Sequence, residues 1–183
     1  MSEKVYYVRR EGVVKMYKIG IIGHSPEHFS DQGSIKVRLN NTLDLLRFQY
    51  GDSVIFNLAG EIGIGLWAAE MCMNKETSYY YHLYLSKVPE ETSEEWYQDQ
   101  KDLLKECYNH AHAMTICGNK NENGPFTYKN LIDSSSFVIC FWVGKHQGRT
   151  YEAIKHALST NKMVLNGLDE LKLITNQDLK KKR

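Results

Sequence analysis

The stretch of this sequence that most constrains the fold is residues 137–143, which reads FVICFWV and contains no charged, amide or hydroxyl side chain. Continuous apolar runs of this kind are typical of strands that are covered on both faces, whereas half-exposed strands alternate apolar and polar residues. The run therefore predicts a central strand of a parallel sheet with helices on both faces. Such a sheet requires further strands that alternate with helices along the chain.

The rest of the chain meets this requirement, because short apolar runs alternate with longer segments that are suited to helices. Strands are predicted at 16–22, 53–58, 79–85, 113–117 and 163–165, and helices at 34–50, 66–73, 93–112, 126–134 and 151–159. This order predicts an α/β fold with a doubly wound, mainly parallel sheet. The remaining segments are expected to be a polar lead over 1–15 with a possible edge strand at 5–8, a loop at 119–124 and a solvated tail at 176–183.

The size of the chain favours one domain. Its 183 residues, of which 42% are hydrophobic and 25% charged, are enough for one well-buried core. We therefore expect a single domain over residues 1–183. Because no segment approaches the roughly 18 apolar residues of a membrane span, and the first residues have no apolar signal core, we expect a cytoplasmic protein without a membrane partner.

Three glycines lie where the predicted strand at 53–58 meets the following helix. The stretch NLAGEIGIGLWAAE begins at Asn57 and contains Gly60, Gly63 and Gly65. Glycine allows a positive φ or the close approach of a ligand to the main chain. At a strand-to-helix junction, free amide groups and the positive helix end can bind a phosphate or another anion. A tight turn without a ligand is the alternative.

A second loop of the same kind follows the apolar run. It reads GKHQGRTYE and contains, in order, Gly144, Gly148, Arg149, Thr150 and Glu152. Because parallel strands end at the same edge of a sheet, this loop is expected to lie beside the first. An arginine there can hold a phosphate through two charge-assisted hydrogen bonds. The alternative is that Arg149 is a surface residue and Glu152 a first-turn glutamate favoured by the helix dipole.

A third loop follows the predicted strand at 16–22 and contains Gly23, His24 and Ser25. Its ring and hydroxyl can contact a ligand, or Ser25 and Pro26 can form a turn before a helix. Trp67 is close enough in sequence to the glycine loop to border a base, with packing in the core as the alternative. Together the three loops predict one pocket at the carboxyl edge of the sheet.

Neither the cysteines nor the histidines indicate a metal or a cofactor. The four cysteines, at 72, 107, 117 and 140, form no CxxC pair, and the histidines lack metal-ligand spacing. We expect reduced thiols, no metal and no cofactor. The formal net charge of +1 provides little attraction for a polyanion, so DNA binding is not favoured.

The motifs GHSP, GEIGIGLWAAE, NLIDSSSFVICFW and GKHQGRTYEAIKHA occur in an order that resembles the SLOG superfamily, and the second is most similar to YpsA-type proteins. This superfamily is Rossmann-like and includes lonely-guy phosphoribohydrolases, the DNA-processing protein DprA and nucleotide sensors. The resemblance covers about residues 17–167 and implies that Gly60, Glu61 and Gly63 form the ligand loop. YpsA-like proteins usually carry an acidic residue where this chain has Gly65, and Glu61 can compensate or be a solvated loop residue.

The resemblance also implies a chemical role for Glu152. Lonely-guy enzymes and nucleoside deoxyribosyltransferases have a glutamate four residues after a glycine, an interval that Gly148 and Glu152 keep. Arg149 stands where threonine is usual in those enzymes. A carboxylate in this place can stabilise or attack the anomeric carbon as a glycosidic bond breaks. Glu152 is therefore one candidate catalytic residue, and Glu61 is the other.

Two function classes fit these residues. The favoured class is the binding of a nucleotide or nucleotide-derived small molecule, as a sensor or sequestering module. The alternative is a hydrolase or transferase that acts on the N-glycosidic bond of nucleotides or nucleosides, with Glu152 as the reacting carboxylate. The resemblance also suggests a homodimer or higher homo-oligomer, to which Trp96 and Tyr97 on the predicted helix at 93–112 would contribute an apolar face.

Overall fold

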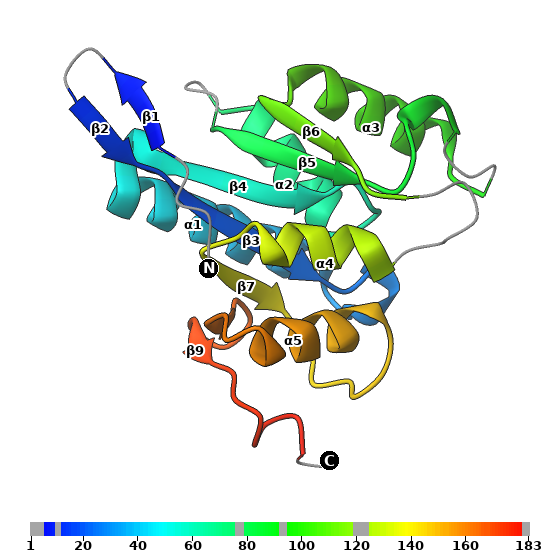
Figure 1. Cartoon of the computed structure of the whole chain (residues 1–183). Coiled ribbons are helices and arrows are strands. Elements are labelled where there is room, and N and C mark those ends of the chain that lie inside the picture. Colours follow the sequence, from blue (N-terminus) through cyan, green and yellow to red (C-terminus); the bar gives the residue numbers. More distant parts are fainter. Residues whose placement is uncertain (1–5, 10–11, 76–78, 92–94, 119–124, 181–183) are drawn as a thin grey trace.

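The computed structural model describes residues 6–9, 12–75, 79–91, 95–118 and 125–180. In these residues seven strands form one sheet, in the order β6-β5-β4-β3-β7-β8-β9 (Figure 1). Every neighbouring pair is parallel except β8 with β9. The strands of this sheet are β3 Tyr17–Gly23, β4 Val54–Ala59, β5 Tyr81–Leu85, β6 Ala113–Ile116, β7 Phe137–Phe141, β8 Val164–Asn166 and β9 Lys172–Leu173.

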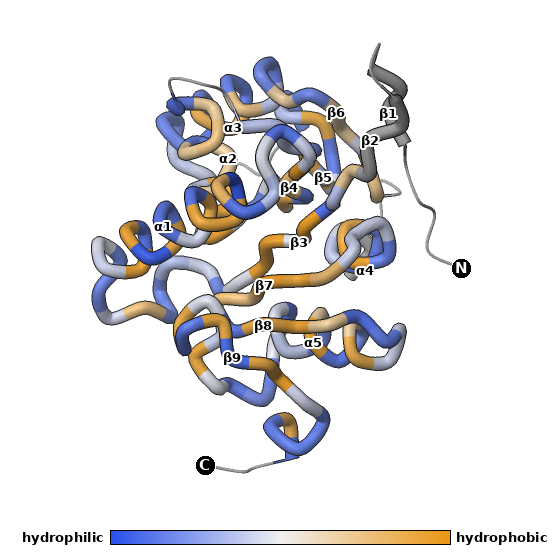
Figure 2. The backbone as a smooth tube through the Cα atoms, turned by 90° about the vertical axis from the view of Figure 1, so that its left-hand side faces the viewer, coloured by the Kyte–Doolittle hydropathy of each residue, from blue (hydrophilic) through white to orange (hydrophobic). Residues whose placement is uncertain are grey.

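The helices cover both faces of this sheet (Figure 2). Their bounds are α1 Gln32–Tyr50, α2 Ile64–Met73, α3 Gln98–His110, α4 Pro125–Asp133 and α5 Arg149–Ser159, with short 3-10 turns at Pro26–His28, Gly51–Ser53 and Pro89–Glu91. On one face α2 packs between α1 and α3, and on the other face α4 packs against α5. The predicted α/β architecture, a doubly wound and mainly parallel sheet with helices on both faces, is confirmed.

The burial of the strands explains this arrangement. All five residues of β7 are buried, as the apolar run predicted. Successive residues of a strand point to opposite faces of a sheet. Accordingly Ile21 belongs to the core under α1, α2 and α3, while its neighbour Ile22 belongs to the core under α4 and α5.

The order of the strands fixes where a ligand site is expected. The chain adds β4, β5 and β6 on one side of β3 and then crosses to the other side with β7. Open α/β sheets bind their ligands outside the carboxyl ends of the strands at such a reversal. The expected place is therefore the edge at which β3 and β7 end.

The N-terminal segment differs from its prediction. Residues 5–8 were expected to add an edge strand to the main sheet, but β1 Tyr6–Arg9 pairs antiparallel with β2 Gly12–Lys15 in a separate two-stranded sheet. The facing backbone groups of these two strands bond to each other, so the pair forms without the main sheet.

The helix predicted at 93–112 begins later than expected. It starts at Gln98, and the Tyr97 amide donates a hydrogen bond to Gln100 Oε1 at 3.1 Å, as at a capped helix start. Trp96 and Tyr97 therefore precede the helix, and the apolar helix face assigned to them is wrong.

Other sequence predictions at the ends of the chain were incomplete. The two-residue strand β9 was not predicted, because it is too short to show a period. Leu179 packs against the core under α4 and α5, so the segment from 176 onward is not solvated throughout. The loop predicted at 119–124 and the last residues, 181–183, lie outside the described residues. In the part of the chain that is described, no helix has the length and apolar character needed to cross a membrane.

Candidate functional site

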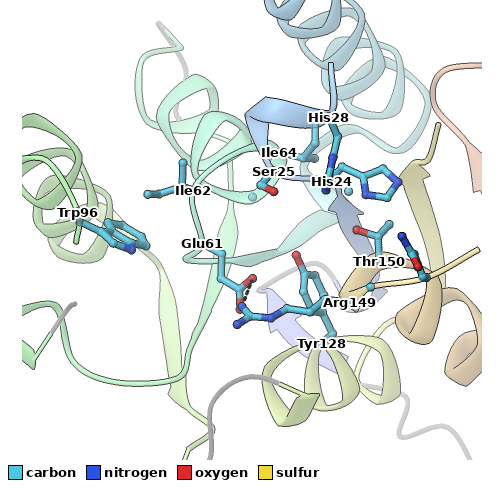
Figure 3. Close-up of a pocket in the computed structure, with 14 residues that line it drawn as sticks. His24, Ser25, His28, Glu61, Ile62, Ile64, Trp96, Tyr128, Arg149 and Thr150 are labelled. Carbon is cyan, nitrogen blue, oxygen red and sulfur yellow. Dashed lines mark hydrogen bonds and ion pairs between the residues drawn. The ribbon is translucent and has the colours of Figure 1, made fainter. Parts of the chain in front are cut away.

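A cavity of about 370 Å³ lies where β3, β4 and β7 end (Figure 3). The loops after these three strands meet there, together with one residue from α4 and one that precedes α3. The residues that line it are Gly23, His24, Ser25, His28, Glu61, Ile62, Ile64, Gly65, Trp96, Tyr128, Gln147, Gly148, Arg149 and Thr150. The cavity thus occupies the sheet edge at which the strand order reverses.

The cavity brings together about half of the residues that the sequence singled out. Those that line it are Gly23, His24, Ser25, Glu61, Gly148, Arg149 and Thr150. Those that do not are Gly60, Gly63, Trp67, Gly144 and Glu152. The ligand-binding and catalytic roles of all these residues stay predictions.

The three glycines of the first loop are surrounded by protein atoms. A Cβ atom on Gly60 would lie 2.1 Å from the Leu85 side chain, and one on Gly65 would lie 2.0 Å from the Ala59 carbonyl oxygen. Gly63 has a φ of 109°, and a Cβ there would lie 2.8 Å from the His24 carbonyl oxygen. Gly63 and Gly65 therefore let α2 pack closely on the ends of β3 and β4, and Gly60 leaves room for the Leu85 side chain of β5.

This packing also explains the departure from the YpsA-type pattern at residue 65. Any side chain there would overlap the backbone oxygen of Ala59, which no change of rotamer relieves. An acidic residue at this position would push α2 away from β4. Glycine is thus the residue that this contact between helix and strand allows.

Both helices that follow the glycine loops point their N-termini at the cavity. Their N-cap residues are Gly63 for α2 and Gly148 for α5, and neither provides a side-chain cap. The first amides of a helix have no acceptor within it, and they carry part of the positive end of its dipole. Because Ile64 and Arg149 both line the cavity, two such positive ends face one space.

An acidic and a basic side chain meet inside the cavity. Arg149 Nη1 lies 3.4 Å from Glu61 Oε2, and the Glu61 side chain is 23% exposed against 61% for Arg149. Desolvation raises the pKa of Glu61, against the opposing effects of Arg149 and the Tyr128 hydroxyl. Burial, together with the nearby Glu61 charge, raises the pKa of Tyr128 well above its ordinary value. Figure 3 shows these three side chains converging from the loop after β4, α5 and α4.

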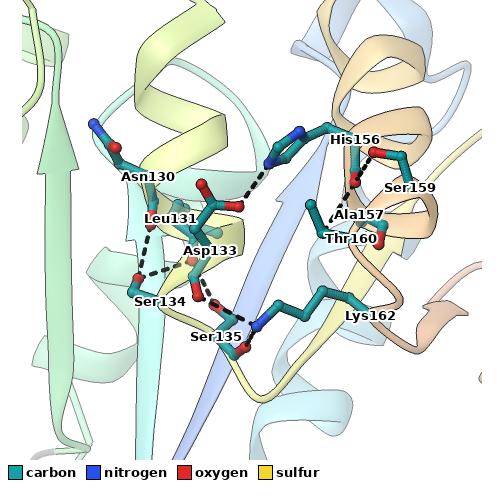
Figure 4. Close-up of polar contacts among 10 residues, drawn as sticks. All are labelled: Asn130, Leu131, Asp133, Ser134, Ser135, His156, Ala157, Ser159, Thr160 and Lys162. Carbon is teal, nitrogen blue, oxygen red and sulfur yellow. Dashed lines mark hydrogen bonds and ion pairs between the residues drawn. The ribbon is translucent and has the colours of Figure 1, made fainter. Parts of the chain in front are cut away.

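Polar contacts join the C-terminal part of α4 to α5 (Figure 4). His156 Nε2 lies 2.6 Å from Asp133 Oδ1, and Lys162 Nζ donates to the carbonyl oxygen of Ser135 at 2.5 Å. These contacts fix the end of α4 against α5 and the segment that follows it. The sequence did not indicate Tyr128, because only the crossover from β6 to β7 brings the start of α4 to the carboxyl edge.

His24 is a neutral and buried histidine in the cavity lining. Its side chain is 5% exposed, and its Nε2 atom has no hydrogen-bond partner among the described residues. The pKa of His24 is lowered to about 4, first by burial and then by His28 and Lys145, with Glu27 opposing. Lys145 Nζ in turn donates to His28 Nδ1 at 2.9 Å. The imidazole is therefore uncharged at neutral pH.

Two of the predicted site residues have other surroundings. The Glu152 side chain is 63% exposed, and one of its carboxylate oxygens lies 3.0 Å from Lys155 Nζ on the same helix. Trp67 is 8% exposed and belongs to the core, with Lys36 Nζ 4.8 Å from its ring centroid. In the described part of the chain, no group of three or more histidine, cysteine or acidic residues is arranged to hold a metal ion.

No family model and no curated protein matches this sequence. Solved structures do match. The molybdenum cofactor binding protein of Rippkaea orientalis has a TM-score of 0.55 and 14% identity, over 83% of this chain and 76% of that one. The molybdenum cofactor carrier protein of Chlamydomonas reinhardtii has a TM-score of 0.54 and 15% identity, over 83% and 76%. DNA processing protein A of Helicobacter pylori, described in a single-stranded DNA binding mode, has a TM-score of 0.52 and 14% identity, over 85% and 71%.

At these identities the likeness concerns the fold. The expected Rossmann-like α/β fold is therefore confirmed.

Proposed function

We propose that this protein binds a nucleotide or a nucleotide-derived small molecule in the cavity, as a sensor or sequestering module. The observation that carries this proposal is the meeting of two positive helix ends with Arg149 in one cavity. Helix N-termini and arginine are the groups that proteins use to bind phosphate. A phosphorylated ligand places its negative charge where this cavity is positive.

The far side of the cavity suits an uncharged, planar group. Ile62 and Trp96 line that side, and the indole of Trp96 lies apart from the helix ends (Figure 3). The volume of about 370 Å³ falls within the range of small-molecule sites. A ligand with a phosphate at one end and an aromatic ring at the other matches both sides.

The structural neighbours support a small ligand and also provide a competing class. Two of them bind or carry the molybdenum cofactor, and one binds single-stranded DNA. A net charge of +1 gives this chain little electrostatic attraction for DNA. We therefore use single-stranded DNA as the comparison ligand and nucleotides as the proposed one.

The enzymatic alternative rests on Glu61 rather than on Glu152. Among the described residues, Glu61 is the one carboxylate in the cavity lining. A carboxyl group with a raised pKa can act as a general acid when a glycosidic bond breaks. Glu152 has its carboxylate outside the lining, next to Lys155. If the protein is a hydrolase or transferase, Glu61 is the residue we assign to the chemistry.

A thermal-shift series over nucleoside monophosphates tests the binding proposal, because a ligand that binds the folded state raises its apparent stability. Arg149→Ala is expected to weaken binding by about 10- to 150-fold, since a charge-assisted hydrogen bond contributes roughly 1.5–3 kcal/mol. Lys129→Ala is the matched control, because it removes an exposed cation of α4 outside the lining. Stabilisation by single-stranded DNA but by no nucleotide would overturn the proposal.

Chromatography of the incubated nucleotides separates the binder from the enzyme. A binding module leaves every nucleotide intact, with Glu61→Gln and Glu152→Gln as inert as the unmodified protein. Release of free base that Glu61→Gln abolishes and Glu152→Gln preserves would establish the enzymatic alternative. Release that Glu152→Gln abolishes would return the chemistry to the residue that the sequence suggested.

Self-association, expected from the sequence resemblance, is a further proposal. The described surface has large apolar side chains exposed along α1, among them Val37 at 60%, Leu45 at 50% and Phe48 at 90%. Exposed apolar residues along one helix often mark a contact between proteins. Light scattering should give a mass near twice 21.2 kDa, and a mass of 21.2 kDa at all concentrations would refute it.

A further inference from the structure

We propose that His24 selects ligands by charge, taking up a proton when a doubly charged oxyanion such as a phosphate or sulfate group enters the cavity. This inference rests on the proposed function, because it concerns the anionic end of the same ligand. His24 is then a specificity-determining residue that distinguishes ligands by their charge. The helix ends, in contrast, bind the oxygen atoms of the ligand.

The geometry of His24 provides the first argument. The residue directly follows Gly23 at the end of β3, and its side chain is 5% exposed. Its ring lies edge-on to the His28 ring, with centroids 4.9 Å apart, and 6.3 Å from that of Phe29. These contacts fix an imidazole whose Nε2 has no partner among the described residues.

A buried polar atom without a hydrogen-bond partner destabilises the folded protein, because it has lost its hydrogen bonds to water. Proteins accept this cost where the atom meets a ligand. His24 lines the cavity while its Nε2 atom is itself buried, so a rotation of the ring would bring Nε2 to a bound molecule. Nε2 is therefore the atom of His24 that we assign to the ligand.

The surroundings of His24 show why the ligand group is an anion. His28 and Lys145 face the ring from the 3-10 turn and from the loop after β7, and both disfavour a positive charge on it. On the opposite side the N-termini of α2 and α5 contribute partial positive charge to the same cavity. These positive groups keep the imidazole of His24 neutral while no anion is bound.

The acidic groups near His24 do not reverse this balance. Glu27 favours the charged ring, but its carboxylate accepts a hydrogen bond from the Ser25 hydroxyl at 2.5 Å. Glu61, in the same cavity, is paired with Arg149. The negative charge that His24 would need to become protonated must therefore be brought by the ligand.

A doubly charged oxyanion changes the protonation of the ring. An opposite charge within about 4–6 Å raises the pKa of a histidine, commonly by one unit or more. The imidazolium then donates a charge-assisted hydrogen bond from Nε2, which is stronger than a neutral one. A singly charged ligand produces a smaller effect, so His24 favours a terminal phosphate over a phosphodiester.

Two probes of similar shape and different charge test this inference. Sulfate is a dianion throughout the range from pH 4 to 8, and methanesulfonate is a monoanion, so neither probe titrates. Nuclear magnetic resonance of the imidazole groups follows the titration of His24 in the unmodified protein, with and without each anion. We expect sulfate to raise the midpoint of the His24 titration by about one pH unit or more, and methanesulfonate to raise it less.

The affinity for sulfate should change accordingly. Because a proton on His24 favours sulfate binding, sulfate should bind more tightly as the pH falls from 7 toward 4. The affinity should rise by up to tenfold per pH unit below the midpoint of the His24 titration in the sulfate-bound protein. The rise should end near the midpoint in the free protein. His24→Asn keeps a donor group and should lose this pH dependence. His110→Asn, which replaces an exposed histidine of α3, should keep it.

The outcomes separate this inference from the proposed function. Tighter sulfate binding at low pH that disappears in His24→Asn, with the shifted titration, supports it. Sulfate binding with an unshifted His24 titration overturns the role of His24 and leaves anion binding intact. If neither sulfate nor any nucleotide binds the unmodified protein, both proposals are overturned.

Discussion

The loop before α2 and the loop before α5 each join a buried strand to a helix, and each contains glycines. In the first loop, Cβ atoms on Gly60 and Gly65 would lie 2.1 and 2.0 Å from Leu85 and Ala59. In the second loop, Gly144 and Gly148 have φ values of 82° and 87°, and nothing lies within 4 Å of a Cβ on either. Packing therefore requires glycine at residues 60 and 65, whereas backbone conformation alone requires it at residues 144 and 148.

This contrast shows what a glycine-rich motif can and cannot indicate. Both loops have the order strand, glycine, helix, which is typical of anion-binding junctions. In the first loop the space around the glycines is filled by the protein's own side chains and backbone. In the second it is open, so the main chain of that loop is accessible to a ligand. The two loops therefore respond differently to the same substitution.

The largest expected effect is that of Gly65→Ala. The new methyl group would overlap a backbone oxygen, so the free energy of unfolding should fall by at least about 3 kcal/mol, at or beyond the usual cost of overpacking. Urea unfolding followed by circular dichroism measures this loss. Gly33→Ala, near the start of α1, is the control, because its nearest neighbour is the exposed Asp31 side chain. Equal stability of the two variants would contradict the packing role of Gly65.

A smaller loss of stability is expected for Gly148→Ala. Its φ of 87° and ψ of 177° lie in a region that glycine alone adopts readily, which costs about 1–3 kcal/mol for alanine. Because the residue lines the cavity, sulfate affinity should fall as well. Thermal unfolding with and without sulfate measures both effects. Gly148→Ala with unchanged sulfate binding would show that the open backbone of the second loop has no role in binding sulfate.

The next largest effect is the change in the free energy of unfolding with pH that His24 causes. The pKa of His24 is about 4 in the folded protein and 6.5 in the unfolded chain, so the unfolded chain binds more protons between these values. Stability is therefore lost as the pH falls from about 6.5 toward 4. The loss from His24 by pH 5 is on the order of 1–2 kcal/mol.

Chemical unfolding between pH 7.5 and 5 tests this dependence. His24→Asn should show a shallower fall in stability than the unmodified protein, while His82 keeps its own contribution, since burial also lowers the pKa of His82 to about 4. A fall of the same steepness in both proteins would contradict a buried, neutral His24.

The smallest expected effect is a change in sulfate affinity when one of the two candidate carboxylates is removed. Glu61→Gln removes the negative charge beside Arg149, so sulfate should bind about two- to fivefold more tightly, as expected for an ion pair in which one partner is largely exposed. Glu152→Gln should leave the affinity unchanged, because that carboxylate pairs with Lys155. Titration with sulfate at pH 7 measures both. Tighter binding in Glu152→Gln alone would place Glu152, and not Glu61, at the site.

The layers of the fold, and the sheet edge at which the cavity lies, could be predicted from local patterns in the chain. The apolar run in β7 required a strand that is covered on both faces, and periodicity identified the main helices. Periodicity is a local property, so it survives without knowledge of the tertiary structure. Because parallel strands end at one edge, the loops that contain His24, Glu61 and Arg149 could be expected to meet.

Which side chains face the cavity depends on contacts between segments that are far apart in the chain. Tyr128 reaches it because the crossover from β6 to β7 brings the start of α4 to the same edge, and no local pattern records that position. Glu152 lies one turn into α5, about 4.5 Å along its axis from Arg149, and its carboxylate turns to Lys155. Whether a glycine admits a ligand or a neighbouring helix depends on atoms that are distant in the sequence. Gly65 and Gly148 show both results within the same fold.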